Sequence, residues 1–390
     1  MTDMAAAESV FNIERRIFPA VQPRLDKRAV QHPDDRLEIV GKIYTPKSNT
    51  NPQKGDVTIV AAHANGLGKE LYEPLFVALL YYSVHARFRI RYILITDIVN
   101  QGESGVRNEN KLGDCMSWTD VSRDLFVILQ ILRPPQPVFA MGHSMGGAQL
   151  FNLAVLHPSL FSGIIGIDPI IESKEDATAV GLNPAKLSSH RKDVWPSKEE
   201  AIKYFKKRTM YRRWDPRVFD LWIKYGLRDL PTKLYREVHG SSADSNQTQV
   251  TLTTTRYQEV WTFVTVNPDY LDKVGNSPPP LDRPDSVEIF DQLHKVKIPT
   301  LFITGGQSDV NDRIHKKTAV MKHAKLITIN NASHFIPFEE VEGTAEHVIA
   351  FLSKVLEQWQ RDNYDDERTP RDTGFNSIYV AALDIRNSKL

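Results

Sequence analysis

The stretch Gly142-His143-Ser144-Met145-Gly146 carries residue types suited to nucleophilic chemistry. It follows an apolar run (137–141) and precedes apolar residues at helical spacing, so we expect a buried strand, a tight turn and a helix. Such a turn lifts the serine hydroxyl out of the sheet, and the flanking glycines avoid clashes with nearby backbone. The N–H groups that open the helix then face developing negative charge. This pattern predicts Ser144 as an activated nucleophile.

A serine hydroxyl becomes a good nucleophile only when a base takes its proton, and a third group must orient that base. Of the 12 histidines, His334 lies in a short polar loop after the last apolar, strand-like run and before a helical segment. That position places its side chain at the same edge of a parallel sheet as Ser144. The sequence therefore predicts His334 as the general base.

Two aspartates are candidates for the acid that orients His334, because the acid precedes the histidine in chains with this serine turn. Asp309 lies just beyond an apolar run, in Gly305-Gly306-Gln307-Ser308-Asp309. Hydrolases with a serine turn of this kind most often carry the acid at that position. Asp168 ends the preceding apolar run. The Gly-Gly-x-Ser sequence after the later run resembles esterases whose acid is displaced to that earlier strand. We favour Asp168 and keep Asp309 as the alternative.

Two backbone donors are needed to hold the oxyanion of a tetrahedral intermediate. The first is the N–H of Met145, the residue after the nucleophile. The second is expected in the loop that begins His63-Ala64-Asn65-Gly66, after the apolar run 57–62. We assign it to Asn65, with Gly66 as the alternative. His63 and His143 are interpreted as structural neighbours of these loops rather than as groups that transfer protons.

Alternating short apolar runs and helical segments predict the elements that position these residues, as a largely parallel sheet covered on both faces. The expected strands are 37–44 (an antiparallel edge strand), 57–62, 91–97, 138–142, 163–168, 298–304 and 324–329. The expected helices include 71–83, 118–132 and a closing helix over 340–357.

The strand pattern stops between Pro169 and Pro284, where the chain is polar, helical in spacing and rich in aromatic residues. An insertion of this length is more than a loop. We therefore predict an irregular arm over 1–36, a core over 37–168 and 285–357, a helical cap over 169–284 and a tail over 358–390. The aromatic residues are expected to form the core of the cap, and several of them to line an apolar acyl pocket.

Composition excludes several classes of function. The formal net charge is +1, which gives no electrostatic indication of nucleic-acid binding. One cysteine, Cys115, excludes an intramolecular disulfide and a cysteine-based zinc site. The longest apolar stretch, Pro74 to Tyr82, is far shorter than the roughly 18 residues of a membrane span. Serine chemistry requires neither a metal nor a cofactor, so we expect none.

The chain ends in Ser388-Lys389-Leu390, the tripeptide that the peroxisomal import receptor reads at a C-terminus. The preceding residues, 358–373, are rich in charge and have the composition of a solvated tail. The sequence therefore predicts import into the peroxisomal matrix, with the import receptor as a partner.

These features together resemble the α/β-hydrolase superfamily over roughly 37–357. More narrowly, His63-Ala64-Asn65-Gly66, the following Lys69-Glu70-Leu71-Tyr72-Glu73-Pro74, the long cap and the peroxisomal tail resemble a fungal group. That group includes a yeast peroxisomal lipase and hydrolases of host-selective toxin biosynthesis. The resemblance implies an α/β-hydrolase fold and an acylated, apolar substrate.

The expected activity is hydrolysis of a carboxylic ester through an acyl-enzyme, as in lipases and esterases. An acyl-CoA thioesterase or an acyltransferase, for example one of a secondary-metabolite pathway, uses the same residues on a thioester and is the alternative. A non-catalytic binding protein on the same fold is the second alternative. The acyl chain, the leaving group and the oligomeric state do not follow from the sequence.

Overall fold

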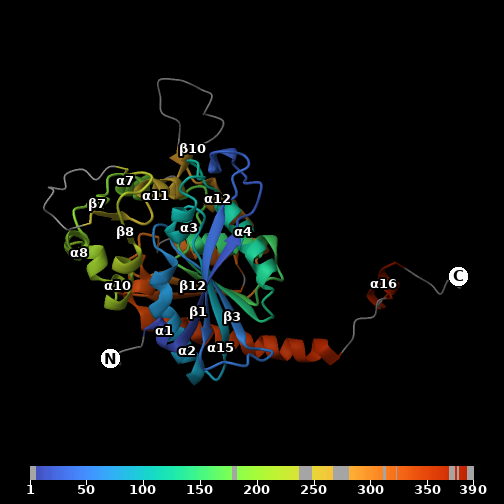
Figure 1. Cartoon of the computed structure of the whole chain (residues 1–390). Coiled ribbons are helices and arrows are strands. Elements are labelled where there is room, and N and C mark those ends of the chain that lie inside the picture. Colours follow the sequence, from blue (N-terminus) through green and yellow to red (C-terminus); the bar gives the residue numbers. More distant parts are fainter. Residues whose placement is uncertain are drawn as a thin grey trace.

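The computed structural model describes residues 6–177, 182–236, 248–266, 281–310, 313–321, 323–368, 374–375 and 377–383. Figure 1 shows a twisted sheet at the centre with helices packed against it. None of the helices in these ranges combines the length and the apolar composition that a membrane span requires.

The central sheet has eight strands in the order β1-β2-β4-β3-β5-β6-β12-β13. Neighbouring strands from β4 to β13 are parallel, whereas β2 runs antiparallel to both β1 and β4. The predicted, mostly parallel sheet is therefore confirmed. Its strands are β1 (Phe11–Pro19), β2 (Glu38–Pro46), β3 (Val57–Ala62), β4 (Ile90–Thr96), β5 (Val138–His143), β6 (Gly163–Ile167), β12 (Thr300–Gly305) and β13 (Ala324–Ile329).

Helices cover both faces of this sheet, which is why β3, β5, β6 and β12 are buried along their whole length and read as unbroken apolar runs. The helices α2 and α15 pack together on one face, and α4, α5 and α12 on the other. The bounds are α1 (Ala7–Val10), α2 (Glu73–His85), α3 (Gly102–Arg107), α4 (Trp118–Leu132), α5 (Met145–Leu156), α12 (Pro284–Gln292), α13 (Ile314–Val320), α14 (Ile336–Glu339), α15 (Val341–Arg368) and α16 (Ser377–Ala382), with the 3-10 turns η1 (Lys27–Ala29), η2 (Lys69–Tyr72) and η4 (Leu293–Lys295).

The segment between β6 and α12 forms the region drawn in yellow-green beside the sheet in Figure 1. It is not purely helical as predicted, because it also holds a three-stranded antiparallel sheet and a two-stranded one. Its elements are α7 (Leu182–Ser189), β7 (Val194–Trp195), α8 (Lys198–Lys206), α9 (Thr209–Arg212), α10 (Pro216–Tyr225), β8 (Leu227–Asp229), β9 (Val250–Leu252), α11 (Arg256–Phe263), β10 (Thr265–Val266) and β11 (Leu281–Asp282). We call this region, including the following turn to α12, the cap.

The prediction of an irregular arm over 1–36 is wrong, because Phe11–Pro19 forms β1 and pairs with β2 along nine residues. The expected edge strand over 37–44 is consequently an interior strand. Most side chains in the middle of β1 are polar and exposed, since β1 is itself the edge of the sheet. That exposure removes the apolar alternation by which a strand is recognised in sequence.

The closing helix is confirmed at its start but extends well beyond the expected end at Glu357. The helix α15 continues to Arg368, through charged residues that the sequence analysis assigned to the tail. Charged side chains do not prevent a helix from continuing into solvent, so composition alone is a poor guide to where it stops. The predicted import signal, Ser388-Lys389-Leu390, lies outside the described residues.

Candidate active site

Ser144 stands at the junction of β5 and α5, with φ 56° and ψ −121°. A non-glycine residue in this conformation is strained by roughly 1–3 kcal/mol. The turn also requires its glycines, because a Cβ on Gly142 would lie 2.5 Å from the carbonyl oxygen of Gly146. A Cβ on Gly146 would lie 2.5 Å from the backbone of Ala62. The serine therefore lies on a compressed strand-to-helix turn, as the sequence predicts.

A line of hydrogen bonds joins Ser144, His334 and Asp168. The distance from Ser144 Oγ to His334 Nε2 is 2.8 Å, and that from His334 Nδ1 to Asp168 Oδ2 is 2.6 Å. A carboxylate accepts only, so Nδ1 carries the imidazole proton and Nε2 is free to accept one from the serine. The three side chains come from the ends of β5 and β6 and from the loop after β13, which meet at one edge of the sheet.

The Asp168 carboxylate is fully buried and has three side-chain partners. Thr304 Oγ1 donates to Oδ1 at 2.7 Å, and the hydroxyl of Ser308 donates to Oδ2, which His334 also contacts. Burial alone raises the pKa of a carboxyl, but the hydrogen bonds and charge of His334 and these hydroxyls hold the pKa of Asp168 below its ordinary value. Asp168 is therefore ionised beside the imidazole.

Asp309, the alternative acid, is not brought to the histidine. Its side chain is exposed at the surface, and its backbone carbonyl accepts a hydrogen bond from Arg313. The loop that carries it contributes Ser308 to the Asp168 carboxylate instead. The Gly-Gly-x-Ser sequence therefore supplies a hydroxyl that supports an acid on the neighbouring strand.

The loop after β3 begins beside the start of α5, because a Cβ on Gly146 would lie 2.5 Å from the backbone of Ala62 and 2.7 Å from the carbonyl oxygen of His63. Ala64 N–H donates to Tyr72 Oη at 2.9 Å, and Gly66 N–H donates to Gln101 Oε1 at 2.8 Å. Among described residues, the Asn65 N–H has no such acceptor. Of the two donors left open by the sequence, Asn65 is thus the one whose amide is available.

His143 lies in a buried chain of hydrogen bonds that the sequence did not reveal. Tyr72 Oη accepts from Ala64 N–H, so its own proton is directed to His143 Nδ1 at 2.9 Å, and His143 Nε2–H donates to the His334 carbonyl at 2.8 Å. Burial lowers the pKa of His143 to about 3, and it is neutral. The chain connects the loop after β3 to the backbone of the histidine loop. No spacing rule links Tyr72 to His143, so only the folded structure reveals the hydrogen bond between them.

His63 is held in the neutral form as well. Its Nδ1–H donates to the Ala64 carbonyl at 2.8 Å, and Ile98 N–H donates to its Nε2 at 3.2 Å. Burial lowers the pKa of this imidazole. Both ring nitrogens are thus used to shape the loop, which agrees with a structural role.

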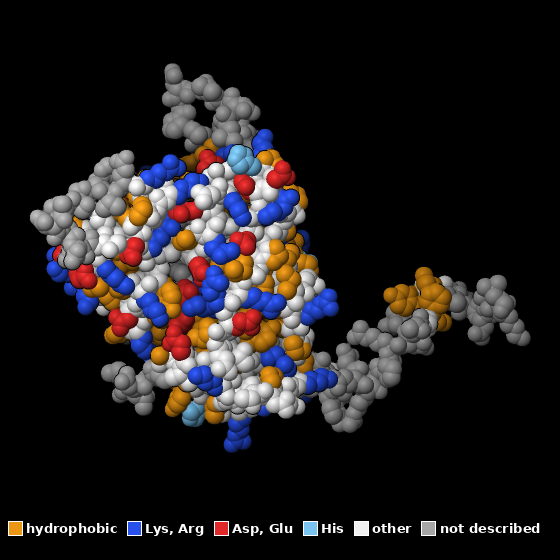
Figure 2. All heavy atoms as spheres, viewed as in Figure 1, with side chains coloured by type: hydrophobic (Ala, Val, Ile, Leu, Met, Phe, Trp, Pro, Cys, Tyr) orange, Lys and Arg blue, Asp and Glu red, His pale blue; other side chains and the backbone are white. Residues whose placement is uncertain are grey.

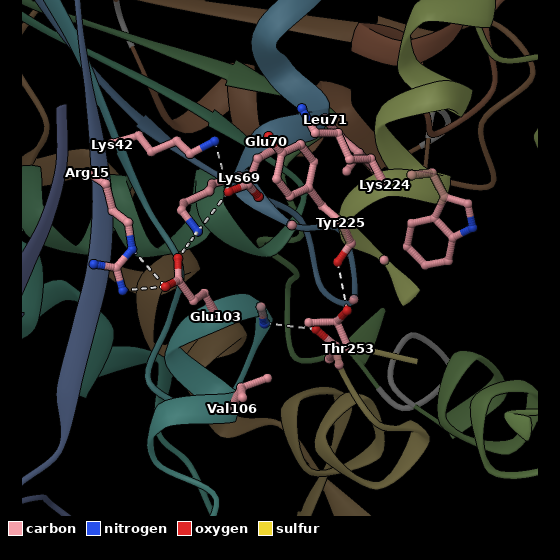
Figure 3. A pocket seen from close by; sticks show the side chains of 16 residues that line it. Arg15, Lys42, Lys69, Glu70, Leu71, Glu103, Val106, Lys224, Tyr225 and Thr253 are labelled. Atoms are coloured by element: carbon pink, nitrogen blue, oxygen red, sulfur yellow. Dashed lines mark hydrogen bonds and ion pairs between the residues drawn. The ribbon is translucent and has the colours of Figure 1, made fainter. Parts of the chain in front are cut away.

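A cavity of about 460 Å³ lies behind this loop, between the core and the cap. Figure 3 shows that charged side chains in its wall point toward one another. Lys69 Nζ lies 2.6 Å from Asp97 and 3.0 Å from Glu70, and Lys42 lies 3.2 Å from the same Glu70. The cations of this wall therefore already have carboxylate partners.

The cap contacts both loops of the site. On one side, Asn65 Nδ2 donates to the Glu259 carbonyl of α11 at 3.0 Å. On the other, Arg213 donates to the Asn331 carbonyl and forms a two-point ion pair with Glu339. Glu339 in turn accepts from both the N–H and the hydroxyl of Ser333, next to His334. The cap thus helps to position the loops that carry Asn65 and His334.

Known proteins resemble this chain over most of its length. Residues 58–341 match the family described as the alpha/beta hydrolase fold. A protein of Penicillium roqueforti named "Type I acyl-CoA thioesterase mpaH" is 32% identical, over 90% of this chain and 89% of that protein. An Alternaria alternata protein named "Abhydrolase domain-containing protein AFT2-1" is 28% identical, over 56% of this chain and 84% of that protein.

The crystal structure of the peroxisomal alpha-beta-hydrolase Lpx1 from Saccharomyces cerevisiae resembles the fold with a TM-score of 0.72. It covers 96% of this chain and 97% of that chain at 19% identity, so it shows the fold alone. The resemblance inferred from the serine turn, the loop after β3 and His334 is confirmed. This chain belongs to the alpha/beta hydrolase family.

Proposed function

We propose that this chain hydrolyses acyl-CoA thioesters through an acyl-enzyme on Ser144. The observation that carries the proposal is the hydrogen-bonded line from Ser144 through His334 to the buried Asp168. It supplies a nucleophile, a base with a free acceptor nitrogen and an ionised acid to stabilise the imidazolium. No other titratable group contacts the serine hydroxyl among the described residues.

The reaction follows from these positions. Ser144 Oγ attacks the thioester carbonyl while His334 Nε2 takes the hydroxyl proton. The N–H groups of Met145 and Asn65 hold the resulting oxyanion. Collapse breaks the carbon–sulfur bond, and His334 gives its proton to the leaving thiolate. Water, deprotonated by His334, then attacks the acyl-serine; the bond to Ser144 Oγ breaks, His334 returns the proton to Oγ, and the carboxylic acid is released.

The choice of a thioester rests on the relatives. From the sequence alone, a carboxylic ester is the first expected substrate and a thioester the second, and one serine mechanism serves both. The relatives that cover nine-tenths of the chain at 31–32% identity are named acyl-CoA thioesterases. These names favour a thioester as the substrate of this chain as well.

Hydrolysis of an apolar carboxylic ester, such as an acylglycerol, is the second candidate. It is favoured by the buried aromatic rings of the cap, which extend to the ring of Phe335 beside His334. We also propose that the cap over 169–284 covers the acyl group during the reaction.

A substrate panel with one acyl chain presented as a CoA thioester and as a glycerol ester tests the function. We expect faster turnover of the thioester, and no turnover or fluorophosphonate labelling of Ser144→Ala. Preference for the glycerol ester selects the second candidate. An intact protein that fluorophosphonate does not label, and that cleaves neither substrate, is a binding protein.

Peroxisomal import through Ser388-Lys389-Leu390 is part of the proposal, and the peroxisomal origin of the yeast structure is consistent with it. A fluorescent protein fused to the N-terminus should enter peroxisomes and should remain outside them when these three residues are removed. Unchanged import of the truncated chain contradicts the assignment.

A further inference from the structure

One part of the cap carries a large net positive charge. Residues 186–217 contain eleven lysines and arginines and four acidic residues, a formal charge of +7. The whole chain has a formal charge of only +1. The positive charge is thus concentrated in α7, α8, α9 and the start of α10.

Seven of these cations are exposed and form no ion pair with a described carboxylate, unlike the paired cations around the cavity of Figure 3. We call them the basic face: Lys186, Lys192, Lys198, Lys206, Lys207, Arg208 and Arg212. Lys and Arg side chains are visible in blue at the left margin of Figure 2, where Figure 1 places α8. Unpaired, clustered cations are available to an anionic ligand at little desolvation cost.

An aromatic ring lies among these cations. The guanidinium carbon of Arg208 is 4.5 Å from the centroid of the Tyr204 ring, and Arg208 Nη2 donates to the Tyr204 hydroxyl at 2.8 Å. The ammonium of Lys192 is 5.9 Å from the same ring. Cations beside a partly exposed ring suit a ligand that has both phosphates and a flat base.

A continuous row of rings leads from this cluster to the reacting histidine. Successive centroids are 4.8 to 5.8 Å apart. The row consists of Tyr204, Phe205, Tyr211, Trp214, Phe335 and His334. In addition, Arg213, the neighbour of Arg212, contacts the histidine loop directly. The basic face and the site therefore belong to one connected part of the molecule.

We infer that the basic face binds the phosphates of the CoA moiety while the thioester lies at Ser144. This inference rests on the proposed function. In CoA a pantetheine arm separates the sulfur from the diphosphate and 3′-phosphate, so these groups must bind away from the serine. Lysines act as point charges for phosphate, and the Tyr204 ring offers a surface for the adenine.

The distribution of charge favours discrete phosphates over an anionic membrane surface. Glu199 and Glu200 lie on the same helix as Lys198 and Lys206, and both are exposed. Carboxylates interspersed among the lysines repel a uniformly negative surface, whereas separate phosphates can bind between them.

The test compares two thioesters of one acyl chain, acyl-CoA and acyl-N-acetylcysteamine, the second of which lacks phosphates. In the double variant Lys206→Glu/Lys207→Glu we expect KM for acyl-CoA to rise roughly tenfold with kcat unchanged. Kinetics on the N-acetylcysteamine thioester should not change, which also shows that the variant is folded. Lys192→Gln/Lys207→Gln should raise KM for acyl-CoA by a smaller factor.

The matched control is Lys295→Glu/Lys297→Glu. These two lysines are exposed and have no carboxylate partner among the residues that the structure describes, and they precede β12, at the sheet edge opposite Ser144. The control should leave KM for acyl-CoA unchanged.

Three results overturn the inference. If the wild type cleaves acyl-CoA and Lys206→Glu/Lys207→Glu has an unchanged KM for it, the basic face does not bind the CoA phosphates. That result leaves the proposed function intact. Loss of binding to phosphatidylserine vesicles with an unchanged KM makes the face a membrane contact instead. A wild type that cleaves neither thioester contradicts the proposed function, and the inference with it.

Discussion

The carboxyl edge of the sheet and the outer face of the cap differ in whether their charged side chains have partners. At the sheet edge, Asp168 has three partners and Lys69 lies between two carboxylates, so charge is balanced before any substrate binds. On the cap, seven cations are exposed and unpaired within the described residues. Fixed, satisfied groups favour chemistry, because they need no reorganisation during the reaction. Unsatisfied exposed groups favour recognition, so changes in the first region should lower kcat and changes in the second should raise KM.

The largest effect is expected at the acid. Asp168→Asn should lower kcat roughly 10⁴-fold, because an amide stabilises the wrong imidazole tautomer and cannot balance the imidazolium. Asp309→Asn should change kcat less than twofold, since its side chain is exposed. Steady-state kinetics on a short acyl thioester measure both. A large loss in Asp309→Asn with full activity in Asp168→Asn reverses the assignment.

The second largest effect on kcat is expected in the loop after β3, where Gly66 and Gly68 can be compared. Gly66 has φ +76°, which strains an alanine, and a Cβ there would lie 2.7 Å from Glu259 Oε1, so we expect Gly66→Ala to disturb the loop that carries the Asn65 N–H. Loss of one oxyanion donor lowers kcat roughly 10²-fold. Gly68→Ala is the control, because φ is −58° and the nearest atom is 3.4 Å away. Equal activity of the two variants argues against Asn65 as a donor.

Two adjacent arginines of the cap are expected to have different roles, one in positioning the histidine loop and the other in recognising CoA. Arg213 contacts Glu339 and the Asn331 carbonyl, so Arg213→Met should lower kcat roughly tenfold on either thioester by loosening the histidine loop. Arg212 makes no contact with that loop among the described residues; its guanidinium donates to Thr209. Arg212→Met should raise KM for acyl-CoA only. If the two substitutions have the same effects on kcat and KM, Arg213 and Arg212 do not have these separate roles.

The smallest effect concerns stability. Because burial lowers the pKa of His143 to about 3, the folded chain binds fewer protons than the unfolded chain between about pH 3 and 6.5. This residue makes the free energy of unfolding fall, by about 1.4 kcal/mol per pH unit, as pH drops below 6.5. His143→Gln retains a donor and an acceptor but does not titrate, so its slope should be shallower. Urea unfolding between pH 4 and 8 measures this, and equal slopes contradict a neutral buried His143.

The positions of Ser144 and His334 in the fold were predictable, because the local sequence around each is distinctive. The turn around Ser144 needs glycines on both sides, and His334 lies in a polar loop between a strand and a helix. The choice between Asp168 and Asp309 was weaker, because both follow apolar runs and differ only in which neighbouring strand they end. The geometry that separates them is a 2.6 Å contact between residues 166 positions apart.

Other features had no signal in sequence. The edge strand β1 is polar because one edge of a sheet faces solvent, and α15 extends through charged residues because a solvated helix tolerates them. The chain from Ala64 through Tyr72 and His143 to His334 joins four residues that no period or motif connects.

The sequence by itself determined the family, the parallel strands of the sheet, the serine turn, the polar loop of His334 and the concentration of cations in 186–217, since each follows from residue types or spacing along the chain. The tertiary structure decided which acid meets His334 and, within the described residues, which amide of the loop after β3 has no acceptor and which cations have no carboxylate partner. These are properties of pairs of distant groups. Hydrogen bonds and ion pairs depend on distances of a few ångströms in space, and the folded chain alone sets those distances.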